Sequence, residues 1–196
     1  MIEIPKVLLN VLPGGRMPER QTDGAIGYDV YARAVVSAHT MDPKNPNLRQ
    51  TLFDFTNLPP NPDVARHVSK KDFNDGNGKE PIYIMDPGES VLVGIGFITA
   101  MSFPMFYWVA PRSGLASKWG ITVTNAPGTV DPDYRGEAGV LVYNRNETTF
   151  DLRRGMRIAQ IIFQWALMPE IAIVNSPEDL PTTSRGSGGF GSTGLQ

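Results

Sequence analysis

The stretch Asn125-Ala-Pro-Gly-Thr-Val-Asp-Pro-Asp-Tyr-Arg-Gly-Glu137 places turn-forming residues between two apolar runs. The runs, residues 121–124 and 139–143, are rich in β-branched and aromatic residues, and the two Pro-containing dipeptides between them are typical of tight bends. We therefore predict two strands of a hairpin joined by an elaborate bend. Backbone N–H and C=O groups exposed at such a bend can read the Watson–Crick edge of a base as a neighbouring strand would. Asp131 and Tyr134 would flank the bound group.

The composition of the whole chain also favours an all-β fold. Twenty glycines and seventeen prolines recur between short apolar runs, which predicts many turns and little helix. The length of 196 residues suits a single domain, residues 1–196. A net charge of −2 argues against a broad surface for DNA or RNA, so we expect no direct nucleic acid binding. The absence of cysteine excludes disulfides, thiolate zinc sites and a cysteine nucleophile.

One uncharged segment, Ser90 to Pro111, has the length and apolar character of a membrane span. Its apolar residues alternate, and Ser102-Phe103-Pro104 interrupts the run, so two buried strands explain it better. Residues 1–12 are typical of an edge strand and show no secretory signal. We therefore expect a cytoplasmic protein that makes no contact with a membrane.

Four further segments combine glycine with charged, amide or hydroxyl side chains that lie close together in the sequence. They are Gly24-Ala-Ile-Gly-Tyr-Asp-Val-Tyr-Ala32, Pro111-Arg-Ser-Gly-Leu-Ala116, Arg154-Gly-Met-Arg-Ile-Ala-Gln160 and Arg185-Gly-Ser-Gly-Gly-Phe-Gly-Ser-Thr-Gly194. With residues 125–137 in third place, they resemble, in order, the five motifs of the trimeric dUTPases, and five motifs in order are far more specific than one. The resemblance covers about residues 1–37 and 82–196. It departs from the family at Met156, where an acidic residue is common, and we expect little loss because that position lies in a turn.

The resemblance implies a dUTPase-like β-barrel or jelly-roll fold (β-clip) with one short helix, and a homotrimer whose active sites are shared between subunits. It implies hydrolysis of dUTP to dUMP and pyrophosphate, which limits uracil incorporation into DNA and supplies dUMP for dTMP synthesis. Asp131 would orient and deprotonate the water that attacks the α-phosphate. The ring of Tyr134 would lie against deoxyribose and leave no room for a 2′-hydroxyl.

The resemblance also assigns the contacts to the base and to the phosphates. Backbone groups of Gly128, Thr129 and Val130 would pair with uracil, and Asn125 would brace that pocket. The residues expected to bind phosphate are Arg112, Ser113, Gly114, Gln160, Arg185, Gly188, Gly189, Ser192 and Thr193. Mg²⁺ would be held mainly by the triphosphate, with Asp29 acting on it through water.

The segment around Ser113 has a simpler reading as a capped helical turn. Ser113 would be the N-cap and Gly120 would end the turn. Free N–H groups at the start of that turn, together with Arg112, would also suit phosphate oxygens.

The C-terminal residues 175–196 are rich in Gly, Ser, Thr and Pro, and composition alone predicts disorder. Within the series of motifs they are instead a flexible Gly-rich arm that folds over the nucleotide. Arg185 and the hydroxyl groups would then contact phosphate, and Phe190 would contact the base.

The segment from His39 to about Pro81 lies outside the resemblance and is turn-rich, with poor periodicity. We interpret it as an insertion within the domain, either a lengthened loop or a site for a protein partner, that could be deleted without loss of fold. Asn61-Pro62-Asp63 predicts the start of a short helix reaching Asp72. Both histidines, His39 and His67, fall here, and we expect them to be exposed, with no carboxylate cluster beside them.

Two other functions are compatible with the motifs. The dCTP deaminases share the fold, but that family has a glutamate on the strand after the hairpin, and residues 139–143 contain none. The other alternative is a dUTPase-fold regulatory protein that binds a protein partner through residues 39–81, with hydrolysis as a secondary activity.

Overall fold

The computed structural model describes residues 5–56 and 59–189, and the chain divides into two units, residues 1–166 (the body) and 167–196 (the arm). The arm therefore begins before residue 175, where the composition changes. Its described part contains one 3-10 helix, η2 (Pro177–Asp179), which begins with a capping box between Ser176 and Asp179.

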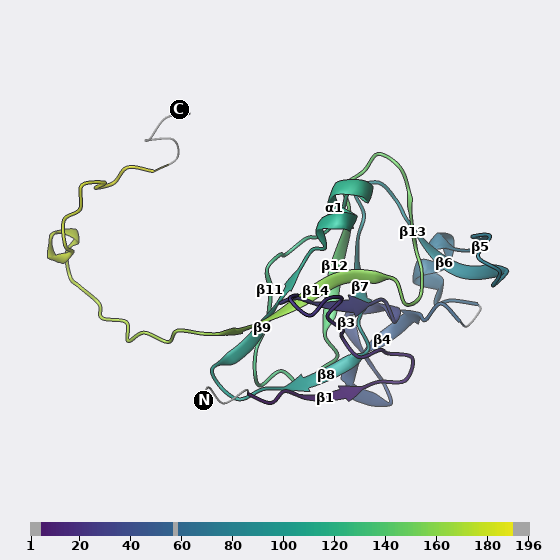
Figure 1. The fold of residues 1–196 in the computed structure, drawn as a ribbon, viewed down its shortest axis with the longest axis horizontal. Coiled ribbons are helices and arrows are strands. Elements are labelled where there is room, and N and C mark those ends of the chain that lie inside the picture. Colours follow the sequence, from purple (N-terminus) through teal and green to yellow (C-terminus); the bar gives the residue numbers. More distant parts are fainter. Residues whose placement is uncertain (1–4, 57–58, 190–196) are drawn as a thin grey trace. The chain divides into compact units, whose positions relative to one another are not determined.

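The body is built mainly from strands, as expected from the many turns in the sequence (Figure 1). In chain order the strands are β1 (Leu8–Val11), β2 (Tyr28–Tyr31), β3 (Ala34–Asp42), β4 (Asn45–Phe53), β5 (Val68–Asp72), β6 (Lys79–Met85), β7 (Ser90–Gly94), β8 (Phe97–Ala100), β9 (Met105–Ala110), β10 (Ile121–Val123), β11 (Gly128–Val130), β12 (Gly139–Asn144), β13 (Phe150–Leu152) and β14 (Arg157–Trp165). Among the described residues there is one α-helix, α1 (Ser113–Trp119), so the all-β prediction with one short helix is confirmed.

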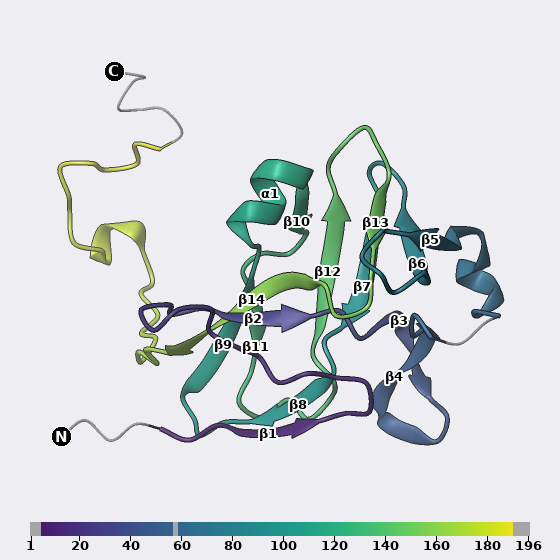
Figure 2. The same cartoon turned by 45° about the vertical axis from the view of Figure 1, so that its right-hand side comes forward.

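Two larger antiparallel sheets enclose the core. One has the order β10-β12-β7-β3-β4 and the other β11-β9-β14-β2, with smaller sheets β1-β8 and β13-β6-β5 at the margins (Figure 2). Alternate residues of each strand point inward, and Val142 from the first sheet and Ile161 from the second are fully buried in one core cluster. Burial of these β-branched side chains is the main source of stability for such a fold.

The predicted hairpin is present, and its bend connects the two larger sheets. β10 pairs with β12, from Ile121 opposite Asn144, whereas β11 within the bend pairs with β9 of the other sheet. The base of the hairpin is fixed by the buried carboxylate of Glu137, which accepts two hydrogen bonds from Arg33 (2.7 and 2.6 Å) and one from the N–H of Gly96 (2.9 Å). A bidentate pair of this kind also fixes the direction of both side chains.

The uncharged run near residues 90–110 forms three strands, β7, β8 and β9, rather than the expected two. The first run is divided at Gly96, which has a φ of +76° and lies so close to Gly15 that a side chain there would collide with that backbone. Within the described part of the chain, no helix has the length and apolar character needed to cross a membrane.

The segment 39–81 is ordered by strands rather than by the predicted helix. Asn61 does cap a helical turn, because its side chain accepts a hydrogen bond from the N–H of Asp63 (2.9 Å), but this 3-10 helix, η1 (Pro62–His67), ends at His67. The prediction of a helix reaching Asp72 is therefore wrong. Residues from Val68 onward form β5, which pairs with β6, and this pairing outweighs the local helical pattern.

The segment also contributes to the core, contrary to the expectation that it could be removed. Phe53 and Phe55 alternate at the period of a strand and are 2% and 3% exposed, and Val64 of η1 is 7% exposed. All three belong to the main core cluster, and the two phenylalanine rings lie 4.9 Å apart. The alternation is short, which explains why the sequence pattern shows poor periodicity.

Phe53→Ala is therefore expected to destabilise the body by about 3–5 kcal/mol, because it leaves a cavity beside Phe55. Urea unfolding at fixed protein concentration would measure the change. Thr51→Ala, at an exposed position of the same strand, is the matched control and should change little. An effect of Phe53→Ala no larger than that of the control would place segment 39–81 outside the cooperative fold.

Candidate functional site

Three of the five motifs meet in one row across the four-stranded sheet. Asp29 on β2 lies opposite Gln160 on β14, and Gln160 lies opposite Ala110 at the end of β9. The chain then passes through Pro111 and Arg112 into α1. The first, second and fourth motifs therefore contribute side chains to the same edge of the body.

These side chains line a cavity of about 330 Å³, which we call the phosphate-site cavity. Its walls are formed by Gln21, Ala25, Ile26, Gly27, Asp29, Arg112, Ser113, Gly114 and Gln160. All of the body residues predicted to bind phosphate are therefore brought together here, along with the proposed metal-associated carboxylate.

The charge beside the cavity is set by the buried carboxylate of Asp29, which pairs with Arg112 in the cavity wall and with Arg157, which is not itself a lining residue. Arg112 Nε lies 2.9 Å from Asp29 Oδ1, and Arg157 Nη1 lies 3.1 Å from Asp29 Oδ2. Arg112 also donates to the backbone oxygen of Arg157 (3.2 Å). One negative and two positive groups leave a net charge of +1, which suits an anionic ligand.

Arg157 is a site residue that the sequence prediction did not include. Residues 157 and 160 should face opposite sides of a regular strand, but the pairing of β14 with β2 shifts register between Arg157 and Ala159. Such a bulge can redirect a side chain, and Arg157 reaches Asp29 in the cavity wall without lining the cavity itself. Gln21 was also missed, and it accepts a hydrogen bond from Arg157 (2.6 Å).

Gln160 is oriented by its neighbours on both sides. Its amide nitrogen donates to the backbone oxygen of Pro111 (3.0 Å). Its side chain occupies the space that a Cβ atom would take on Gly27, which explains the glycine in the first motif. The amide of Gln160 is therefore held in one orientation at the wall of the cavity.

The helical turn after Arg112 is present, but its N-cap is Arg112 and not Ser113. Ser113 is the first helical residue, and the N-cap residue Arg112 makes no side-chain capping hydrogen bond, so the prediction of Ser113 as the N-cap is wrong. Both Ser113 and Gly114 are exposed toward the cavity, and no side chain lies close to Gly114. Gly120 ends the helix in the left-handed conformation as predicted, with a φ of +61°.

The hairpin residues form a second group on the body. Gly128 is buried beside the amide of Asn125, and Tyr134 donates to the backbone oxygen of Glu137 (3.1 Å), which fixes its half-exposed ring. The Asp131 carboxylate is exposed and makes no hydrogen bond with any described residue. None of these residues lines the phosphate-site cavity of the same chain.

The register of β11 separates the two groups within one chain. Val130 pairs with Tyr107 of β9, and Arg112 lies five residues farther along the chain in the direction away from Asp131. At a rise of about 3.3 Å per residue, the end of β9 at Ala110 lies about 10 Å along the strand from the level of Val130, and Arg112 is two residues beyond that end.

The predicted arm residues are only partly within the described chain. Arg185 and Gly189 are exposed, and the N–H of Gly188 donates to the backbone oxygen of Arg185 (3.1 Å). Phe190, Ser192 and Thr193 lie outside the described residues.

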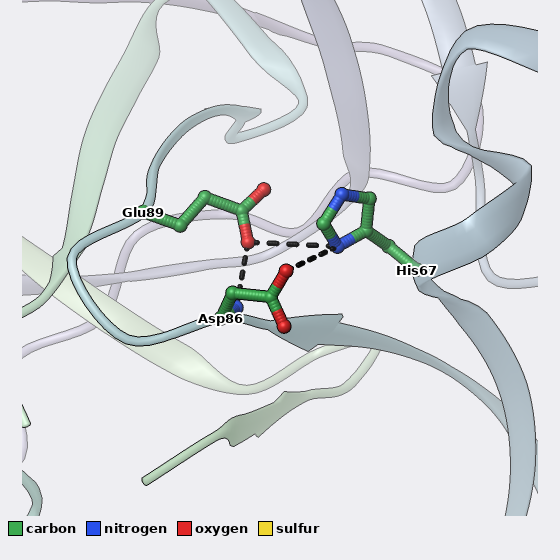
Figure 3. A group of neighbouring side chains, drawn as sticks. All are labelled: His67, Asp86 and Glu89. Carbon is green, nitrogen blue, oxygen red and sulfur yellow. Dashed lines mark hydrogen bonds and ion pairs between the residues drawn. The ribbon is translucent and has the colours of Figure 1, made fainter. Parts of the chain in front are cut away.

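His67 is buried, so the expectation of an exposed histidine in a polar loop is wrong for this residue. Its side chain is 8% exposed and stacks on the Tyr83 ring, with centroids 5.0 Å apart. Its Nδ1 lies 3.8 Å from Asp86 Oδ2 and 3.6 Å from Glu89 Oε2 (Figure 3). No carboxylate cluster is expected beside this histidine from the sequence, but Asp86 and Glu89, which lie outside the 39–81 segment, supply one.

These three residues could in principle bind a metal ion, but the hydrogen bonds define a different role. Arg66 Nε, which can only donate, lies 2.9 Å from His67 Nε2, so the ring proton belongs on Nδ1, where it is donated to the oxygen of Ile84 (3.0 Å). Glu89 in turn accepts from the Tyr83 hydroxyl and the N–H of Asp86, both at 2.7 Å. Burial and the bond to Glu89 raise the pKa of Tyr83 above its ordinary value. The cluster therefore connects η1 to the turn that joins β6 to β7 and has a structural role.

The protein is thus an all-β fold with a cavity beside paired arginines, an arrangement suited to a small anionic ligand. The family model for dUTPase matches residues 80–194. A deoxyuridine 5′-triphosphate nucleotidohydrolase from Picosynechococcus is 39% identical over 138 residues, covering 70% of this chain and 94% of that protein. One from Nautilia profundicola is 47% identical over 111 residues, covering 57% and 76% respectively.

The fold has solved counterparts as well. A Staphylococcus bacteriophage 80alpha dUTPase mutant with dUpNHpp has a TM-score of 0.66 at 17% identity, covering 97% of this chain and 99% of that chain. A mutant dUTPase from phage phi11 of S. aureus, described with a structural Mg(II) ion, has a TM-score of 0.59 at 15% identity and covers 89% of this chain and 99% of its own. This chain belongs to the dUTPase family.

Proposed function

We propose that this protein hydrolyses dUTP to dUMP and pyrophosphate, with the phosphates bound in the phosphate-site cavity and the attacking water activated by Asp131. The observation that carries the proposal is the assembly of Asp29, Arg112 and Gln160, from three separate motifs, into one cationic cavity. The family membership supports the same reaction.

The geometry of the cavity suggests how the triphosphate is held. Arg112 and Arg157 are fixed by Asp29, and Gln160 is fixed by Pro111, so these groups need little reorganisation when phosphate oxygens bind. The exposed Ser113 hydroxyl and the open backbone at Gly114 add short-range contacts. Arg185, Gly188, Gly189, Ser192 and Thr193 of the arm complete the set in our proposal.

The site suits a magnesium ion that contacts Asp29 through bound water rather than directly. Each Asp29 oxygen already accepts one hydrogen bond from a guanidinium group, so direct coordination would compete with both arginines. The remaining lone pairs can accept hydrogen bonds from waters on an ion carried by the triphosphate. Asp29 would orient the waters on a bound Mg²⁺, which would supply positive charge to the phosphate oxygens.

The hairpin is proposed to select the base and the sugar. Backbone groups of Gly128, Thr129 and Val130 pair with uracil, and the amide of Asn125, which lies against Gly128, braces that segment. Tyr134 is held by its bond to Glu137 and blocks the position of a 2′-hydroxyl. In our proposal Asp131 takes the proton from the water that attacks the α-phosphorus, while the bond from that phosphorus to the pyrophosphate oxygen breaks.

We further propose that each active site is shared between chains of a homotrimer. The absence of the hairpin residues from the phosphate-site cavity of their own chain supports this, because both groups must contact one nucleotide. Leu167, Ile171 and Ile173 of the arm are 90%, 86% and 92% exposed, which favours contact with another chain.

The direct test is pyrophosphate release from dUTP, dCTP, dTTP and UTP under the same conditions with Mg²⁺. We expect hydrolysis of dUTP and little of the other three. Equal rates across the four nucleotides would overturn the assignment of uracil and deoxyribose recognition to the hairpin.

Tyr134→Ala is expected to relax sugar discrimination, so that the ratio of kcat/KM for UTP to that for dUTP rises by about tenfold or more. The reason is steric, because the alanine no longer fills the position of the 2′-hydroxyl. Tyr134→Phe is the control, since it keeps the ring and removes only the bond to Glu137. An unchanged preference in Tyr134→Ala would rule out the steric explanation.

The alternative functions gain no support from the comparisons. The curated relatives described above are nucleotidohydrolases, and none is a deaminase. A protein partner at residues 39–81 and a cytoplasmic location remain predictions from the sequence.

A further inference from the structure

Arg153, at the corner between β13 and β14, is held entirely by residues of the 39–81 segment. Its guanidinium lies 2.9 Å from Asp75 Oδ2 and 2.8 Å from Glu80 Oε2, and a second bond of 3.2 Å joins its Nε to Glu80. The guanidinium carbon also lies 3.8 Å from the centroid of the Phe73 ring. The bond from Arg153 lowers the pKa of Asp75 below its ordinary value, and the N–H of Asn77 adds to this effect. The tip of the β5–β6 hairpin therefore binds one arginine of the motif-bearing part of the chain.

A second ion pair reinforces the same junction. Lys71 of β5 pairs with Asp151 of β13, and β13 itself pairs with β6. The segment is thus joined both to Arg153 and to β13 just before it, and Arg153 is the last residue before the turn leading to β14.

That turn connects Arg153 directly to the phosphate-site cavity. Gly155 donates to the oxygen of Ala32 (2.8 Å), and Ala32 donates to the oxygen of Met156 (2.9 Å), so the turn docks against the end of β2. Arg157 follows at once, with its side chain on Asp29 and its backbone oxygen accepting from Arg112. A shift of the turn would move both cavity arginines together.

A cavity of about 660 Å³ lies between the β5–β6 hairpin and the phosphate-site cavity, and Arg112 and Arg157 line it together with Phe73 and Arg153. The four cationic residues in its walls, Lys71, Arg112, Arg153 and Arg157, are all paired with carboxylates. Lys71 and Arg153 have carboxylate partners of their own, which favours a role for the hairpin side of this cavity in holding its walls in place.

We propose that Arg153 is a positioning residue through which the β5–β6 hairpin fixes Arg157 and Arg112 for triphosphate binding. The inference rests on the proposed phosphate role of the cavity. Displacements of about 1 Å at a binding group can cost a large factor in rate, so a contact four residues away from Arg157 is sufficient to matter.

The test compares the affinities of dUMP and of a non-hydrolysable dUTP analogue for the full-length protein by calorimetry. Arg153→Ala is expected to weaken triphosphate binding by about tenfold while leaving dUMP binding nearly unchanged, because only the added phosphates use the two arginines. Arg153→Lys, which keeps the charge but loses the planar stacking on Phe73, should fall between Arg153→Ala and wild type. Lys70→Ala, on the exposed face of β5, is the matched control.

The same measurements distinguish an effect of the contacts between Arg153 and the β5–β6 hairpin from a general loss of structure. Combining Asp75→Asn and Glu80→Gln should reproduce the effect of Arg153→Ala, and adding Arg153→Ala to that double variant should change little, as expected for one shared link. Equal losses for dUMP and triphosphate would show a merely structural role and overturn the proposal.

Arg112→Ala separately tests the proposed binding of phosphate in the phosphate-site cavity. If it does not weaken triphosphate binding, the phosphate-site assignment fails, and the positioning role fails with it. If Arg112→Ala weakens triphosphate binding and the Arg153 variants do not, only the positioning role of Arg153 is overturned.

Discussion

Asp131→Asn is expected to lower kcat by a factor of about 10²–10⁴ while nucleotide affinity stays nearly unchanged, because an amide can hold a water but cannot accept its proton. The structure suits this role, since the carboxylate follows β11 at the tip of the bend, is exposed, and has no hydrogen-bond partner among the described residues. Rapid-quench turnover of dUTP, together with calorimetry on a non-hydrolysable analogue, separates chemistry from binding.

Asp133→Asn is the matched control, because Asp133 is exposed two positions along the same bend. It should retain most of the turnover. Turnover of Asp131→Asn close to wild type would remove Asp131 from the mechanism.

Truncation after Ser184 is the second change with a large expected effect. The arm from residue 185 onward carries Arg185, Ser192 and Thr193, and its described residues are mostly exposed, so it should add little to the stability of the fold. If the arm closes over bound nucleotide, its loss removes phosphate contacts and admits water. We expect the melting temperature and the oligomeric state to be unchanged, and kcat/KM to fall by about tenfold or more.

A shorter truncation after Gly194, which removes only Leu195 and Gln196, serves as the control and should remain active. The oligomeric state is expected to survive both truncations because the exposed apolar residues Leu167, Ile171 and Ile173 are retained. Full activity without residues 185–196 would contradict the proposed closure of the arm.

The local features of the fold could be predicted from sequence where short-range chemistry determines them. The strands on each side of residues 125–137, the left-handed Gly120 that ends α1, and the Asn61 cap depend on backbone conformation and neighbouring residues. The family motifs likewise predicted five of the nine residues that line the phosphate-site cavity, namely Asp29, Arg112, Ser113, Gly114 and Gln160.

The features that were missed depend on contacts between distant parts of the chain. The burial of His67 needs Tyr83 and Glu89, and the turn of Arg157 toward Asp29 needs a bulge that only the pairing of β14 with β2 reveals. The role of residues 39–81 in the core could not be seen from their turn-rich composition, because Phe53 and Phe55 form only a short alternating pattern. Periodicity detects long elements well and short ones poorly.

The central claim, that dUTP is hydrolysed at sites shared between chains, is tested most directly by combining two inactive variants. Arg112→Ala and Asp131→Asn chains carrying different affinity tags would be co-expressed, and trimers containing both would be purified through both tags. If each site takes Arg112 from one chain and Asp131 from another, every mixed trimer regains one intact site, or about one third of the wild-type rate of pyrophosphate release from dUTP.

The matched control combines Arg112→Ala with Gln160→Ala, which affect the same cavity of the same chain, so that no site in a mixed trimer is intact. We therefore predict recovery of dUTP hydrolysis for the first pair and none for the second. A first pair no more active than its separate variants would contradict a shared site and place Arg112 and Asp131 in the active site of a single chain.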